Sequence, residues 1–193
     1  MPWQKSFDVE QAVDQAMEVF WAKGYEATSM ADLLEATGIN KGSLYNAFGS
    51  KKKLFVRALL KYDREQRQAA LGELADLEDP LTAIELLFES MVAKSLSDKD
   101  CKGCMLVNTA LDLPNHDGDV ARIVRAGMKD LDVFFRQQIA LGQSQGSIPP
   151  DRDPASTAQA LLALLVGLRV LARGASDEAG LRAIKQQALA LLS

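Results

Sequence analysis

The sequence has 193 residues and a net charge of -4, and 48% of its residues are apolar, which suffices for a globular core. The most hydrophobic stretch, residues 160–172, contains Arg169 and is shorter than the roughly 18 residues of a membrane span, so we expect a buried or interface helix. Two cysteines and a leader without an apolar segment exclude a disulfide framework and a secretory signal, which predicts a cytoplasmic protein.

Helical periodicity extends along the chain, and no stretch shows the sustained alternation of a β-strand. We therefore predict an all-α fold of about nine helices, separated by glycine, proline and N-capping residues. In chain order the helices are expected at about residues 8–23, 29–37, 41–48, 50–76, 80–96, 103–111, 119–143, 155–173 and 177–192.

Residues 29–48 have the spacing of a helix-turn-helix, the unit that places a second, short helix in the DNA major groove. Ser29 and Asp32 form a capping-box pair, and Gly38 can take the positive φ that the turn requires. Apolar residues such as Leu44 can fix the second helix to the core. Its other face is then left for DNA.

Charge is distributed unevenly, because residues 36–57 hold five basic residues and no acidic one. We expect seven residues to face DNA: Lys41, Gly42, Ser43, Tyr45, Asn46, Ser50 and Lys51. Lysine, serine and asparagine suit base edges or phosphates, tyrosine suits a phosphate, and glycine permits close backbone approach. The helix that starts at residue 50 presents free N–H groups to a phosphate.

These residues resemble the TetR/AcrR family of transcriptional repressors over about residues 7–55. The resemblance lies in FWAKGYEATSMADLL and in TGINKGSLYNAFGSKKKLF, which is similar to the family pattern G-[VI]-x-x-[GP]-[ST]-L-Y-x-x-F-x-[SN]-K-x-x-L-[FL]. It implies a sequence-specific DNA-binding regulator, a repressor that a small-molecule inducer releases from a palindromic operator. It also implies a DNA-binding domain at 1–55, a ligand-binding and dimerisation domain at 56–193, and further DNA contacts from Ser29 and Met30.

The same resemblance implies a homodimer formed by the last two helices. The apolar stretch 160–172 agrees, since a helix that is apolar around most of its circumference packs on its own domain and on a partner. The expected interface residues are Ala163, Gly167, Val170, Leu181 and Ile184. A helix buried at the centre of a monomer is the alternative.

An inducer pocket is expected among residues 81–143, where KGCMLVNTALDL resembles a G-C-x-x-x-N segment of one TetR subgroup. The candidate lining residues, each of which could equally belong to the core, are Phe88, Met91, Cys104, Met105, Asn108, Leu111, Met128, Phe134 and Phe135.

The CKGC motif of Cys101 and Cys104 has several interpretations. A CxxC pair at a helix start suits dithiol chemistry, but no βαβ context accompanies it. Zinc needs about four ligands, and His116 is the only histidine, so neither a metal nor a cofactor is expected. Cys104 could sense oxidants or electrophiles, or both cysteines could be incidental.

The sequence leaves two alternatives to the ligand-responsive repressor. An enzyme is not expected, because the sequence shows no paired nucleophile and base. The other alternative is a DNA-binding dimer that responds to no ligand.

Overall fold

The computed structural model describes residues 7–116 and 118–193. The expectation that the chain carries no secretory signal rests partly on residues 1–6, which lie outside this range. Within it the protein is all-α, as predicted. If one continuous rod is counted as a single helix, the described residues form nine α-helices and no strand.

The N-terminal helices begin and end at the residues that the capping signals predict. Asp8 caps the first helix, and Ser29 and Asp32 form the expected capping box at the start of the second. Gly38 ends the second helix with φ of 63°, the left-handed conformation that glycine favours. The helices are α1 (Val9–Lys23), α2 (Met30–Thr37) and α3 (Lys41–Phe48).

The fourth predicted helix is a long rod with a π-helical turn at its centre. It consists of α4 (Lys51–Tyr62), η1 (Asp63–Gln68) and α5 (Ala69–Ala75). Asp63 is buried in this turn, where its carboxylate accepts hydrogen bonds from Arg67 Nε at 2.5 Å and Gln68 Nε2 at 3.0 Å. The sequence predicted the extent of the rod but not the π turn. The expected domain boundary after residue 55 falls inside α4.

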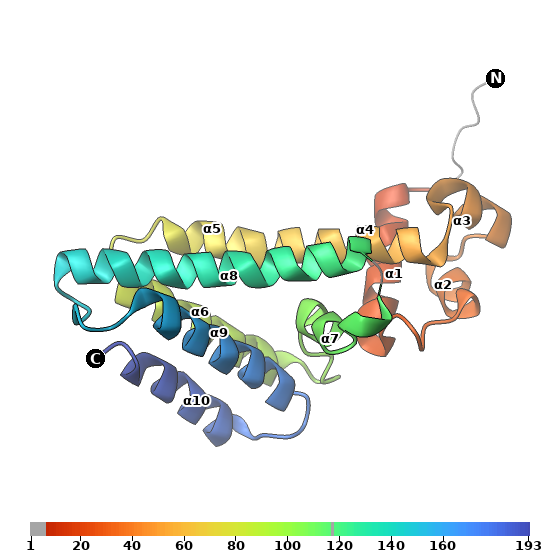
Figure 1. Ribbon diagram of the computed structural model, residues 1–193. Coiled ribbons are helices and arrows are strands. Elements are labelled where there is room, and N and C mark those ends of the chain that lie inside the picture. The colour runs from red at the N-terminus through yellow and green to blue at the C-terminus, as the bar shows by residue number, and fades with distance from the viewer. Residues whose placement is uncertain (1–6, 117) are drawn as a thin grey trace.

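Most of the remaining helices pack together in a bundle along the rod, whereas α7 (Met105–Leu111) lies beside α1 and α4 (Figure 1). The others are α6 (Pro80–Ser97), α8 (Gly118–Gln145), α9 (Pro154–Leu171) and α10 (Glu178–Ala190), with the short 3-10 helix η2 (Leu113–Asn115). The rod and α8 lie side by side, while α1 to α3 sit at one end of the pair. Any movement of α4 is therefore transmitted directly to the helix-turn-helix.

Two hydrophobic clusters form the core. The first joins α1 to α4 through Phe20, Leu44 and Phe55, and it also takes in Met105 of α7 and Val120 of α8. The second cluster lies among α6, α8, α9 and α10. Because α7 and the start of α8 belong to the first cluster, the DNA-reading end and the bundle are packed against one another.

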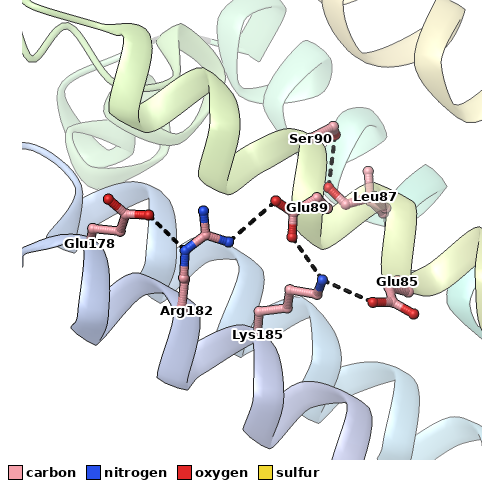
Figure 2. A network of polar contacts seen from close by, with 7 residues as sticks. All are labelled: Glu85, Leu87, Glu89, Ser90, Glu178, Arg182 and Lys185. Carbon is pink, nitrogen blue, oxygen red and sulfur yellow. Dashed lines mark hydrogen bonds and ion pairs between the residues drawn. The ribbon is translucent and has the colours of Figure 1, made fainter.

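Helix α10 packs against α6 of the same chain (Figure 2). Lys185 Nζ lies 2.9 Å from Glu85 and 2.7 Å from Glu89, while Arg182 Nε donates to Glu178. Exposed ion pairs of this kind contribute little, so the burial of Leu181 supplies more of the stability of this contact.

Helix α9 is the one helix among the described residues that is long and apolar enough to cross a membrane by length and composition. This is weak evidence, since a core helix of a soluble protein meets the same criteria. Only 28% of the helix is buried inside the protomer. Its exposed or half-buried residues include Ala163, Gly167, Val170 and Leu171.

Candidate nucleic-acid interface and ligand cavity

The sequence places α3 with one face in the core and one face in solvent. Asn40 caps the helix by accepting from Ser43 N at 2.9 Å, and Leu44 and Phe48 are buried beneath it. Four of the residues expected to face DNA are exposed: Lys41, Gly42, Tyr45 and Asn46. Their common face is polar, positively charged at its first residue, and open to a large partner.

Ser43 is a correction to the expected set of DNA contacts. Its side chain does not face outward, because the residue is buried, with 8% of its surface exposed. On the helix it lies beside Leu44 and one turn before the half-buried Ala47, on the flank that faces the core. A small hydroxyl side chain fits this position without displacing the packing.

Ser29 and Met30 lie at the start of α2. The Ser29 hydroxyl donates to Asp32 Oδ2 at 2.7 Å and accepts from Asp32 N. Hydrogen bonds from Lys23, and then from Ser29, hold the pKa of Asp32 well below its usual range. Met30 is half-buried against the first core cluster. The capping box thus fixes the helix that carries the recognition unit.

The start of α4 supplies a second polar group beside α3. Ser50 caps the helix by accepting from Lys53 N at 3.2 Å. Lys51 Nζ lies 4.4 Å from the centroid of the Tyr25 ring, a cation–π contact that leaves its positive charge without a carboxylate among the described residues. A helix N-terminus and a lysine are together suited to bind a phosphate.

A cavity of about 480 Å³ lies between the rod and the bundle. Of the residues expected to line a pocket, Met91, Cys104 and Met128 do so. Its walls come from all three parts of the rod and from α6, α7, α8 and α9, with Trp21 of α1 and the loop 98–104. Cavities of this size hold small organic molecules.

The other six expected lining residues do not line this cavity. Phe88, Phe134 and Phe135 are buried in the second core cluster, because the inward faces of α6 and α8 pack on α9 there. Met105 and Asn108 border a separate cavity of about 60 Å³ next to α1. Leu111, at the end of α7, is 62% exposed.

The prediction missed most of the polar residues of the cavity wall. They are Tyr62, Asp63, Gln66, Arg67, Lys94, Asp98, Lys99, Asp100, Lys102 and Arg169, with the indole of Trp21. The sequence offered one signal of this polar wall, Arg169, because burying a single arginine within a long apolar helix costs free energy unless the arginine is paired or functional. The contributions of α1 and η1 carried no such signal, because they depend on how the rod docks.

The two cysteines differ in environment. Cys101 is exposed with φ of 51°, whereas Cys104 is half-buried at the N-terminus of α7 and lines the cavity. Burial, and next the neighbouring Cys104, raise the pKa of Tyr62, which keeps its hydroxyl neutral. His116 packs against the rings of both Tyr25 and Phe55. Within residues 7–116 and 118–193 no group of three or more histidine, cysteine or acidic side chains could hold a metal.

Three of the five expected dimer-interface residues lie on open surface. Ala163 is exposed, Gly167 and Val170 are half-buried, and a Cβ added to Gly167 would meet no atom within 4 Å. Leu181 is a correction, because it is buried at 2% exposure in the core of its own protomer. Ile184 packs partly against the same core. The open apolar face therefore lies chiefly on α9.

Comparison with known proteins identifies the family. A family model described as bacterial regulatory proteins, tetR family, matches residues 12–58, and one described as tetracyclin repressor-like, C-terminal domain, matches residues 80–188. The chain belongs to the TetR family. The family prediction from the sequence is thereby confirmed, and the TetR-family chain described here is a DNA-binding transcriptional regulator.

Individual relatives agree with this assignment. The TetR-family chain is 33% identical to the HTH-type transcriptional repressor ComR of Escherichia coli over 90% of its own length and 84% of ComR. It is 30% identical to the uncharacterized regulator YezE of Bacillus subtilis, over 90% of each chain. A cysteine mutant of the TetR family regulator CifR in complex with operator DNA superposes with a TM-score of 0.84, at 31% identity and coverage of 97% of this chain and 98% of CifR.

Proposed function

We propose that this regulator is a cytoplasmic repressor that binds a palindromic operator as a homodimer and is released by a small molecule. In this proposal residues 1–55 bind DNA, and residues 56–193 bind the ligand and dimerise. The observation that carries it is the exposed polar face of α3 beside the N-terminus of α4, joined by one rod to the wall of a cavity.

The DNA contacts divide by chemistry. Lys41 and Asn46 suit base edges, whereas Tyr45 and the helix start at Ser50 and Lys51 suit phosphates. Gly42 allows the helix backbone close to the groove. Within the protomer a Cβ at Gly42 would contact only Asn40 Oδ1, at 3.5 Å, so protomer packing does not require glycine there.

A homodimer is supported by the open face of α9. The helix is strongly apolar, yet only 28% of it is buried in the protomer, and small residues at 163 and 167 allow a second helix to approach closely. A two-fold dimer presents two recognition helices to successive turns of DNA, and a palindromic operator matches that symmetry.

The rod supplies a route from the cavity to the DNA. Its π turn lines the cavity, and Arg67 of that turn binds both Asp63 and Asp130 of α8, the latter at 3.0 Å. In this proposal a molecule bound in the cavity contacts the π turn and α8 and reorients them. Because α4 is continuous with this turn, the recognition helices then change their spacing and lose the match to two half-sites.

The proposal is tested by selecting bound sequences from random DNA and titrating the selected duplex with the purified protein. We expect a palindromic site bound by two protomers. Lys41→Ala and Asn46→Ala should each change the preferred bases, whereas Lys129→Ala, an exposed lysine on α8, should leave them unchanged. Binding that shows no sequence preference in the unmodified protein would contradict the proposal.

A second mode of release has one observation in its favour, the position of the Cys104 thiol in the cavity wall. An oxidant or electrophile that modifies this thiol would occupy the same space as a bound ligand. A Cys104→Ser variant that loses DNA affinity under oxidants as readily as the unmodified protein would rule this out. The third alternative, a dimer without a ligand, is disfavoured by a cavity of this size.

A further inference from the structure

The cavity contains a buried positive charge that no acidic side chain of the described residues pairs with. Arg169 of α9 is 6% exposed, and its Nη1 donates to Ser95 Oγ at 2.6 Å and to the Met91 carbonyl at 3.3 Å. Its Nε is buried without a hydrogen-bond partner, and no carboxylate of the described residues pairs with it. A guanidinium stays charged in a protein, so burial in this state is costly.

A second cation stands on the same cavity wall. Lys94 of α6 is more exposed, and its Nζ donates to Gln66 Oε1 at 3.2 Å and to no carboxylate of the described residues. Burial, and next the charge of Arg169, lower the pKa of Lys94, so each cation is within electrostatic reach of the other. We place Arg169 deep in the cavity and Lys94 toward its mouth.

The acidic side chains of the cavity wall do not compensate these two charges. The wall holds five basic residues against three acidic ones. Asp63 accepts a hydrogen bond from Arg67, and Asp98 Oδ2 accepts one from Gly103 N at 2.7 Å. Asp100 is exposed at the edge of the cavity. Two of the basic residues, Arg67 and Lys102, pair with carboxylates outside the wall. The charge that is left without a carboxylate among the described residues therefore includes the buried guanidinium of Arg169.

The rest of the wall is mainly apolar, with Leu71, Leu87, Leu106, Leu131 and Leu165 among its residues. Such a surface favours a hydrocarbon or aromatic body, while the buried guanidinium favours an anionic group at one end. A ligand without a hydrogen-bond acceptor would leave Arg169 as it is, with its Nε unsatisfied, and a charged acceptor binds a guanidinium more strongly than a neutral one.

We propose that the ligand of this cavity is an amphiphilic organic anion, whose carboxylate or similar head binds Arg169 with help from Lys94. The apolar body lies among the leucines of the wall. This inference rests on the proposed function in taking the cavity as the ligand site, and it adds the chemical class of the ligand.

Two dyes of nearly the same shape provide the test. 1-Anilinonaphthalene-8-sulfonate carries one negative charge, and N-phenyl-1-naphthylamine is the same aromatic body without the sulfonate. Fluorescence titration of the full-length dimer should show saturable binding that is at least about tenfold tighter for the anionic dye, as expected for a hydrogen bond between charged groups. Equal affinities, tighter binding of the neutral dye, or no saturable binding would overturn the proposal.

Variants assign the preference to named side chains. Arg169→Met should weaken the anionic dye by about tenfold or more and leave the neutral dye within about twofold, whereas Arg169→Lys should retain part of the preference. Arg136→Met is the matched control, because Arg136 is a half-buried arginine of α8 that lies outside the cavity and pairs with Asp132. An Arg169→Met variant that keeps the full preference, or loses both dyes equally, would refute the assignment. If this variant does not fold, Lys94→Gln at the mouth provides the test. It should lower the ratio of the affinity for the anionic dye to the affinity for the neutral dye, and an unchanged ratio would refute the proposal.

Operator binding is measured separately in each variant, so the two proposals can fail independently. If the anionic dye binds through Arg169 but does not release operator DNA, the ligand class holds and ligand-controlled repression is wrong. If an uncharged compound releases DNA while the anionic dye does not bind, repression is regulated as proposed and the ligand class is wrong.

Discussion

The open face of α9 leads to a sharp prediction about Gly167. A Cβ at this position meets nothing within 4 Å in the protomer, and the same holds for Gly72 on α5. Replacing either glycine by alanine should therefore stabilise the isolated protomer by about 0.8–1 kcal/mol through helix propensity. Only the change at 167 lies on the face that we assign to the dimer.

Arginine at the two positions separates helix propensity from association. In Gly167→Arg, two unpaired guanidinium groups would meet across the two-fold axis at a cost of several kcal/mol, which raises the dimer dissociation constant by at least about a hundredfold. Gly72→Arg should remain as dimeric as the unmodified protein. Sedimentation velocity across a concentration series measures the dissociation, and thermal unfolding checks that both variants fold. A Gly167→Arg protein that stays dimeric would show that the interface lies elsewhere.

Two predictions concern the DNA-binding end. Tyr45→Phe combined with Lys51→Ala should weaken binding to operator and random DNA alike. The slope of log affinity against log salt should fall in magnitude by about 1.8, since each protomer loses one charged phosphate contact. Lys129→Ala should leave the slope unchanged, and an unchanged slope in the double variant would contradict the assignment. Because the hydrogen bond from Lys23 holds the pKa of Asp32 low, its contribution to stability is complete above about pH 4 and is lost as the pH falls through the lowered value. Asp32→Asn should make unfolding less dependent on pH in that acid range, which chemical denaturation at a series of pH values can measure, and an unaltered dependence would count against this role.

Much of the local structure was predictable because its signals lie within a few residues of one another. Asn40 and Ser50 cap the starts of α3 and α4, and Gly38 takes the positive φ expected of the turn. A capping hydrogen bond spans about three residues, so its partners can be identified without tertiary structure. The burial of Ser43 was not predictable in this way, because a residue at the edge of a helix face is buried or exposed according to how the helix is tilted.

The cavity shows where local reasoning stops. Phe88 and Phe135 have the residue type of a pocket wall, yet close packing of α6, α8 and α9 buries them in solid core. Tyr62 and Arg67 line the cavity because the rod docks along the bundle, and nothing within their own segment indicates this. Apolar periodicity identifies the face of a helix that is buried, and it does not indicate whether that face meets a neighbour or an empty volume.

The sequence by itself determined the class of this protein, since helical periodicity, the capping residues and the spacing of residues 29–48 are properties of neighbouring residues. It also determined the charge of the DNA-reading end, because all five basic residues of 36–57 lie within one short segment. Only the tertiary structure decided which side chains share the cavity and that Arg169 is buried there without a carboxylate from residues 7–116 or 118–193. Those relations join helices that are distant in the chain, and they depend on packing that no single segment encodes.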